Sequence, residues 1–321
     1  MEIKIKELDE ISNIDGLVDE SINGTAFCYE YFLKLKNVKE ILCVYHGEKL
    51  IALMPLFVNG NDLNQSTMYI PYGGPLFLYK NFSYRKFILY TRNIIFEITN
   101  YLKDNYNSIC FSLDPVITDI IPCVKNDFVP EVRYTYKIDL RKSIEEIYSN
   151  FGGDRKDNIK KTQDVEIILD DKLEYFNFDE ALKWEYNYGN EISSSFVKEY
   201  VKESIALCKG KCFVARKNKK VLGGVAVVWD KKNCYIMYSF YDGKEKTVIP
   251  LLYYEIIKYL KDNNICDYLD FEGSVFKEIE EWNLSFGATQ VLYFNLYYEK
   301  GKKEDLYGEL YDYGEKNEKQ F

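Results

Sequence analysis

The sequence predicts an α+β fold (mixed α/β) made of two related domains, each a mixed, mostly antiparallel sheet flanked by helices. The first observation is an internal repeat: Tyr101-Leu-Lys-Asp-Asn105 recurs as Tyr259-Leu-Lys-Asp-Asn263, 158 residues later. The second is that the patterns around both copies follow one order of hairpin, strand, helix, strand and strand. Each half therefore reads β-β-β-α-β-(α)-β, and its one helical crossover requires a locally parallel pair of strands.

Each element is predicted by its own pattern. Alternating apolar residues around a short polar turn favour a hairpin in each half, and the single histidine, His46, lies in the first of these turns. Long apolar runs at helical spacing predict the crossover helices. The expected elements of the two halves are, respectively, hairpins at 41–57 and 212–229, third strands at 68–71 and 234–240, helices at 87–102 and 248–260, strands at 109–114 and 265–270, and last strands at 132–140 and 291–298.

The domain boundary is expected after Leu140, where the second half opens with two short helices. Ser143 and Glu146 have the spacing of a capping box, and Gly152-Gly153 then interrupts the helix. The expected domains are an N-terminal one at 1–140 and a C-terminal one at 141–300, followed by a charged tail at 301–321.

Composition excludes several classes of function. The net charge of −9 argues against a general DNA-binding protein, since such proteins present a basic face. With one histidine, and eight cysteines that form no C-x-x-C pair, neither a Ser-His-Asp triad nor a metal site is expected. No apolar run reaches the ~20 residues of a membrane span. The N-terminus lacks a signal-peptide core, so a cytoplasmic protein is expected.

Two places in the second half are candidates for chemistry. Gly243, Lys244, Lys246 and Thr247 precede a helix, whose N-terminal N–H groups and dipole attract anions such as a pyrophosphate. The alternative is a solvated turn with ordinary surface charges.

The other place is the strand end at Asp270, Glu272 and Ser274. Asp270 and Glu272 share one face by the strand period of two, and ligands bind outside the carboxyl ends of diverging strands. A carboxylate there can accept a proton from an amine nucleophile. The alternative is that Glu272 or Ser274 only caps the next helix.

Two more segments suit a ligand. Tyr72, Gly73 and Gly74 form a loop whose glycines let the backbone approach a ligand closely, with a structural turn as the alternative. The helical segment from Arg155 to Lys161 carries a net charge of +3. This charge suits a phosphate clamp, with a solvated helical face as the alternative.

Several segments in order resemble the FemA/FemB-related (BioF2-like) branch of the GNAT acyltransferase superfamily. They are Tyr136-Lys-Ile-Asp-Leu140, which resembles the strand leading into the C-terminal domain; 155–161, which resembles the R-x-x-I-x-K helix; Leu269-Asp-Phe-Glu-Gly-Ser274, which resembles F-D-F-x-G-S; Ser285-Phe-Gly-Ala288, which resembles F-G-A; and the Tyr-Gly-Gly-Pro loop at 72–75. The resemblance implies two GNAT-like domains in tandem. It also implies transfer of an acyl or aminoacyl group to an amine in a bacterial protein.

The resemblance also implies substrates and roles. The donor is acyl-CoA (acetyl-CoA), held at 243–247 without a metal, and the acceptor is a small-molecule amine or a sugar-linked cell-envelope or polysaccharide precursor. Glu272 is the candidate base, Tyr238 or Tyr241 gives a proton to the leaving group, and a backbone N–H stabilises the oxyanion. The expected substrate-binding residues are Tyr72, Gly73, Gly74, Arg155, Lys161, Asp270 and Ser274.

Two alternatives stay open. The segment at 243–248 lacks the second and third glycines of the GNAT motif Q/R-x-x-G-x-G/A, which keeps an aminoacyl-tRNA-dependent aminoacyltransferase of the peptidoglycan type in view. The acidic charge balance disfavours tRNA as a partner. The other alternative is a non-catalytic, ligand-binding scaffold with a GNAT-like fold.

Overall fold

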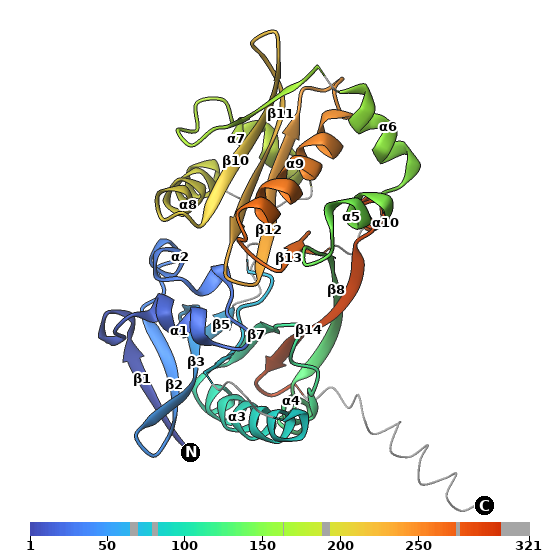
Figure 1. Ribbon diagram of the computed structural model, residues 1–321. Coiled ribbons are helices and arrows are strands. Elements are labelled where there is room, and N and C mark those ends of the chain that lie inside the picture. The colour runs from blue at the N-terminus through green and yellow to red at the C-terminus, as the bar shows by residue number, and fades with distance from the viewer. Residues whose placement is uncertain (65–69, 79–82, 163, 188–192, 274–276, 303–321) are drawn as a thin grey trace, which may run out of the picture. The chain divides into compact units, whose positions relative to one another are not determined.

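The computed structural model describes residues 1–64, 70–78, 83–162, 164–187, 193–273 and 277–302 (Figure 1). The chain forms two compact units, and each unit takes separate segments of the sequence. Unit 1 comprises Met1–Glu10, Glu40–Val132 and the chain from Tyr293, and unit 2 comprises Ile11–Lys39 and Arg133–Leu292. The predicted domains, in contrast, are continuous in sequence, and their boundary after Leu140 stays a prediction.

Unit 1 contains two sets of paired strands and a long helix. The strands β1, β2, β3 and β6 form an antiparallel sheet. In the second set β5 runs parallel to β7, which also pairs with β14. The described elements are β1 (Glu2–Glu7), η1 (Leu8–Glu10), β2 (Glu40–His46), β3 (Lys49–Leu56), β4 (Val58–Asn59), β5 (Asp62–Asn64), β6 (Leu76–Phe77), α3 (Tyr84–Asn105), β7 (Ser108–Leu113), α4 (Ile121–Lys125), the start of β8 (Val129–Asp139) and the end of β14 (Thr289–Glu299).

The crossover helix α3 forms because its apolar residues recur at three- and four-residue spacing. Ile94, Ile98 and Leu102 are fully buried along one side. Of the predicted third strand at 68–71, residues 68 and 69 lie outside the described residues, and the parallel neighbour of β7 is β5. Within the described part of the chain, no helix is both long and apolar enough to span a membrane.

Unit 2 contains a strongly twisted mixed sheet with helices on both faces. Its strands follow the order β8, β13, β12, β11, β10, β9, and every neighbouring pair is antiparallel except β12 with β13. The described elements are α1 (Ile14–Glu20), η2 (Ala26–Cys28), α2 (Glu30–Leu35), the end of β8, α5 (Ile144–Ser149), α6 (Gly153–Lys161), β9 (Glu166–Leu169), α7 (Phe178–Asn187), α8 (Ser194–Ala206), β10 (Gly210–Lys217), β11 (Lys220–Trp229), β12 (Asn233–Tyr241), α9 (Val248–Asp262), β13 (Tyr268–Asp270), α10 (Lys277–Leu284) and the start of β14.

The parallel pair in unit 2 is the crossover that the sequence predicted. β12 leads into α9, which returns the chain to β13 alongside β12. Together with the antiparallel remainder, this confirms the mixed α+β class.

The two hairpins share an irregularity that supports the internal repeat. A β-bulge shifts the register between Val44 and Tyr45 in the first hairpin and between Ala215 and Arg216 in the second. The bulges are 171 residues apart (215 − 44), the offset between the predicted hairpins. A bulge bends and twists a strand, so both hairpins have the same local shape.

The core of unit 2 lies between the sheet and α9. Leu252, Ile256 and Leu260 of α9 are fully buried against strands β10 to β13. Figure 1 shows α9 on this face and α7 and α8 on the other. Phe286, which the repeat pairs with Phe128, is fully buried and packs on Phe271.

Candidate active site at the end of β13

The two parallel strands of unit 2 separate after a short ladder. β12 pairs with β13 only from Asn233 to Tyr235, opposite Tyr268 to Asp270. β12 then continues to Tyr241, whereas the chain after β13 turns toward β8, where the Phe271 N–H donates to the Tyr136 carbonyl at 3.0 Å. The strands therefore diverge at their carboxyl ends, where ligands bind in mixed sheets.

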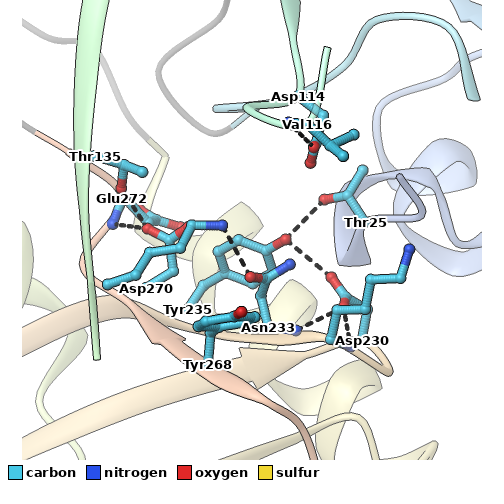
Figure 2. Close-up of polar contacts among 12 residues, drawn as sticks. Thr25, Asp114, Val116, Thr135, Asp230, Asn233, Tyr235, Tyr268, Asp270 and Glu272 are labelled. Carbon is cyan, nitrogen blue, oxygen red and sulfur yellow. Dashed lines mark hydrogen bonds and ion pairs between the residues drawn. The ribbon is translucent and has the colours of Figure 1, made fainter. Parts of the chain in front are cut away.

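Asp270 fixes the backbone at this divergence. Its carboxylate is fully buried and accepts hydrogen bonds from Thr135 Oγ1 at 2.5 Å and from the Glu272 N–H at 2.9 Å, while Lys137 Nζ lies 3.1 Å from its other oxygen. Figure 2 shows Thr135 and Glu272 next to Asp270. Both carboxylate oxygens of Asp270 thus bind other residues of unit 2, and direct contact of Asp270 with substrate stays a prediction.

Glu272 and Gly273 hold an uncommon backbone conformation. Their φ angles are 61° and 77°, in the left-handed region that favours glycine. A Cβ at Gly273 would lie 2.2 Å from the Tyr134 carbonyl oxygen, so the close approach of β8 requires glycine there. A non-glycine residue with a left-handed backbone costs on the order of 1 kcal/mol of stability, and such residues are common at functional sites. This agrees with a functional role for Glu272.

Glu272 and Tyr238 lie within electrostatic reach of Tyr200, a residue of α8 on the sheet face away from α9. Glu272 Oε1, Tyr238 Oη and Tyr200 Oη are all shielded from solvent. Tyr238 reaches this face because the β12 register shifts after Ile236, which places Tyr238 opposite Ala226. Burial, followed by the charges of neighbours that include Glu272 and Tyr238, raises the pKa of Tyr200 well above its usual value. The predicted residues Glu272 and Tyr238 both influence the buried Tyr200, whereas Tyr241 is 37% exposed at the strand end, and the catalytic roles of all three stay predictions.

Asp230 is a polar centre that the sequence analysis missed. It lies in the turn between β11 and β12, is 3% exposed, and accepts four hydrogen bonds, from the N–H groups of Ala26, Lys232 and Asn233 and from Tyr235 Oη. Burial nevertheless raises its pKa to about 6. Figure 2 shows Asp230 beside Tyr235 and Thr25. An aspartate that opens a turn is typical of an Asx turn, but its burial depends on a segment about 200 residues away.

The N-terminus of α9 offers few N–H groups to a pyrophosphate, and pyrophosphate binding at this turn stays a prediction. Three of its N–H groups, at Glu245, Val248 and Ile249, already bond to carbonyls within the turn. Pro250 has no N–H to offer. The predicted residues Gly243 and Lys244 are exposed, and Lys246 Nζ lies 5.5 Å from the centre of the Trp282 ring. Thr247 makes no side-chain cap.

Arg155 joins two of the resembling motifs. Its guanidinium stacks on Trp282 at 4.0 Å, and its Nε donates to Ser285 Oγ at 2.7 Å. In addition, the Gly152 N–H donates to the Ser285 carbonyl at 2.7 Å. The basic helix and the F-G-A segment thus pack on each other, which gives Arg155 a structural role. Lys161 is exposed, and its contact with substrate stays a prediction.

The remaining predicted residues belong to unit 1 or fall outside the described residues, and their contact with substrate stays a prediction. Tyr72 is buried in unit 1 against Tyr293, and the Gly74 N–H donates to the Ser112 carbonyl at 2.8 Å, as a structural turn would. Gly73 lies in the same loop. Ser274 lies outside the described residues. Among the described side chains, no three His, Cys, Asp or Glu residues are grouped to hold a metal ion.

The comparisons with known proteins agree on the fold. No model of a protein family matches the chain, and no curated protein matches its sequence. Among solved structures, FemX is 11% identical with a TM-score of 0.64 and covers 92% of this chain and 97% of its own. L-PGS from Bacillus licheniformis is 9% identical with a TM-score of 0.58, covering 93% and 94%. A tandem GNAT protein from the clavulanic acid biosynthesis pathway is 10% identical with a TM-score of 0.51, covering 94% and 100%. These structures confirm the predicted resemblance at the level of fold: the chain has the mixed α+β fold of the FemX and tandem GNAT proteins.

Proposed function

We propose that the protein is an N-acyltransferase that moves an acyl or aminoacyl group to an amine. The observation that carries the proposal is the divergence of β12, which contains the buried Tyr238, from β13, where the Glu272 N–H donates to Asp270 and Glu272 has a left-handed backbone. This arrangement places a carboxylate and a phenol at the carboxyl end of a parallel pair. The fold shared with FemX and a tandem GNAT protein agrees with this class of reaction.

The proposed chemistry is direct transfer. The amine attacks the donor carbonyl, a C–N bond forms, and the bond from the carbonyl to the leaving sulfur or oxygen breaks. Glu272 takes the proton that the amine releases, and Tyr238 or Tyr241 supplies one to the leaving group. A backbone N–H of β12 on the side away from β11 is the candidate donor to the oxyanion. Most of the rate acceleration comes from holding the amine and the donor carbonyl in a reactive orientation.

For the donor, the turn before α9 favours aminoacyl-tRNA over acyl-CoA. Acyl-CoA needs a grip on its pyrophosphate, and at the N-terminus of α9 the Val248 and Ile249 N–H groups bond within the turn while Pro250 has none. An aminoacyl ester on tRNA does not need that grip, and Lys244 and Lys246 then supply charge for phosphates of the RNA backbone. The acceptor we propose is a small-molecule or sugar-linked amine of the cell envelope.

A thermal-shift titration distinguishes the donors. The probes are CoA, acetyl-CoA and a mixture of aminoacyl-tRNAs, each tested on the wild type and on a Lys244→Ala/Lys246→Ala variant. A ligand at 100 times its Kd stabilises the folded state by about 2.7 kcal/mol. We expect a saturable shift with aminoacyl-tRNA that the variant weakens. A variant lacking Lys183 and Lys202, exposed lysines on other helices, serves as the charge-matched control.

The result with CoA and acetyl-CoA tests the alternative donor, an acyl thioester of CoA. A saturable shift with CoA or acetyl-CoA that the double variant abolishes would overturn the proposed donor and restore the thioester. Shifts that are equal in the double variant and in the charge-matched control would show that the turn holds neither donor.

A further inference from the structure

The outer face of helix α3 in unit 1 carries large apolar side chains that the core does not use. Leu89 and Phe96 are 46% and 39% exposed. They are two helical turns apart and therefore lie on the same side of α3. That side is nearly opposite the one that is buried through Ile94, Ile98 and Leu102. A surface helix ordinarily presents polar residues there, so this face is unusual.

Helix α4 lies beside α3 and adds a third exposed apolar side chain. The Asn126 side chain, directly after α4, donates to the Phe96 carbonyl at 3.0 Å (Figure 1). At the other end of α4, Asp119 accepts from Arg92 Nε at 2.7 Å and from the Ile121 N–H at 3.2 Å. These bonds place Ile121, which is 49% exposed, beside the same turns of α3. Three exposed apolar side chains are thus gathered on two packed helices rather than scattered singly.

Cations flank these apolar side chains. Because successive residues of a helix are rotated by about 100°, Arg85 and Lys86 lie on either side of Leu89, one turn before it. On α4, Lys125 lies one turn after Ile121. All three cations are exposed, and none has an ion-pair partner among the described residues. Since the whole chain has a net charge of −9, this local positive charge is specific to the face.

The acidic residues of α3 lie toward its other end. From Tyr84 to Phe96 the helix contains three basic residues and no acidic one, whereas Glu97 and Asp104 belong to its second half. Exposed apolar residues between cations suit an anionic bilayer, in which apolar side chains enter the head-group boundary and cations attract lipid phosphates. Nucleic acid would use the cations, but it is bound through phosphate contacts and aromatic stacking rather than through exposed leucine and isoleucine.

We propose that unit 1 binds the surface of an anionic membrane through a docking face on α3 and α4. This face consists of Arg85, Lys86, Leu89, Phe96, Ile121 and Lys125. Its apolar side chains enter the head-group region, and its cations bind the lipid phosphates. The binding goes beyond the proposed acyl transfer and does not depend on it.

The test is cosedimentation with vesicles of phosphatidylcholine alone or of phosphatidylcholine and phosphatidylglycerol in equal parts. We expect the wild type to bind the anionic vesicles at low salt, to bind the neutral ones far more weakly, and to be released by added salt. Arg85→Gln/Lys86→Gln should weaken binding about 30-fold, as expected for the loss of two basic residues at an anionic surface.

The apolar part of the face is tested separately. Leu89→Gln/Phe96→Gln should weaken binding about tenfold or more although every charge is kept, because less apolar surface leaves water. Ile121→Gln, on the other helix, should weaken it by a smaller factor. These side chains are exposed, so the variants should keep the wild-type melting temperature.

Matched controls come from the helices of unit 2. Lys183→Gln/Lys202→Gln removes two exposed lysines of α7 and α8. Leu207→Gln/Leu284→Gln replaces two leucines that are each 48% exposed, at the ends of α8 and α10. Both controls should bind anionic vesicles as the wild type does.

Three results would overturn the proposal. The first is no binding of the wild type to anionic vesicles at low salt, and the second is an equal loss in the docking-face variants and in the controls. The third is a loss in the charge variant alone, with both apolar variants binding like the wild type. That result would indicate a purely electrostatic face, such as one for RNA. Because no acyl donor or amine is present in the assay, its outcome is independent of the proposed function.

Discussion

The buried carboxyl group of Asp230 makes the stability of the fold depend on pH. Its pKa in the folded protein is about 6, against 3.8 for an exposed aspartate. Because the folded pKa is raised, the stabilising contribution is fully present below the unfolded pKa and is lost as the pH rises through about 6. Each pKa unit corresponds to 1.36 kcal/mol, so the whole window is worth about 3 kcal/mol.

The expected change in the free energy of unfolding is measurable between pH 5 and pH 7. With these two pKa values, the Asp230 contribution at pH 5 exceeds that at pH 7 by about 1.3 kcal/mol. Asp230→Asn removes this linkage, although an amide oxygen can replace only one of the two carboxylate oxygens that now accept pairs of hydrogen bonds. The variant should therefore also be less stable at pH 7, by about 1–3 kcal/mol for each donor left unsatisfied.

The assay is urea unfolding followed by circular dichroism at pH 5 and pH 7. Other carboxyl groups titrate in this range, so the quantity to compare is the wild-type free energy of unfolding minus that of Asp230→Asn at each pH. This difference should be larger at pH 5 than at pH 7 by about 1.3 kcal/mol. A difference that is equal at the two pH values, or larger at pH 7, would refute the assignment of a raised pKa to Asp230.

Three further substitutions test the packing around the candidate site. Gly273→Ala should destabilise by more than about 1 kcal/mol, since its backbone is left-handed and the new Cβ would meet the Tyr134 carbonyl; equal melting temperatures would contradict this. Phe286→Ala, which empties a position between Phe271 and its aromatic neighbours, should cost about 3–5 kcal/mol in urea unfolding. Arg155→Lys loses the stacking on Trp282 and the bond to Ser285, so it should cost about 1–2 kcal/mol even though the charge is kept; a cost equal to zero would favour a free phosphate clamp instead.

The sequence was sufficient for the architecture because the architecture follows from local patterns. The hairpins, the crossover helices and the parallel pair of β12 with β13 all follow from apolar periodicity and from the repeat. The sequence also led to Glu272, since a carboxylate after a short buried strand must lie at the end of a sheet. Its left-handed backbone could not be foreseen, because it depends on the Asp270 hydrogen bond and on the approach of β8.

Other features depend on contacts between distant segments. Residues 11–39 carry no motif that assigns them to unit 2, and their attachment through Asp230 appears only when β11 and β12 are in place. Likewise, a basic helix looks the same in sequence whether its charges face solvent or stack on a tryptophan, so the contact of Arg155 with Trp282 could not be foreseen. Phosphate binding by Arg155 stays a prediction. The turn at 243–248 lacks two glycines of the GNAT motif, and Pro250, inside the helix, offers no N–H, so pyrophosphate binding there stays a prediction.

The central claim is that Glu272 serves acyl transfer at the end of β13. The most direct measurement follows radiolabel from aminoacyl-tRNA or acetyl-CoA to glucosamine or lysine methyl ester, in the wild type, in Glu272→Gln and in Glu278→Gln, an exposed glutamate on α10. The account predicts transfer by the wild type and by Glu278→Gln, and a loss of about 10² or more in kcat for Glu272→Gln with donor binding retained. Transfer by Glu272→Gln at the wild-type rate, or no transfer by the wild type from either donor, would contradict it.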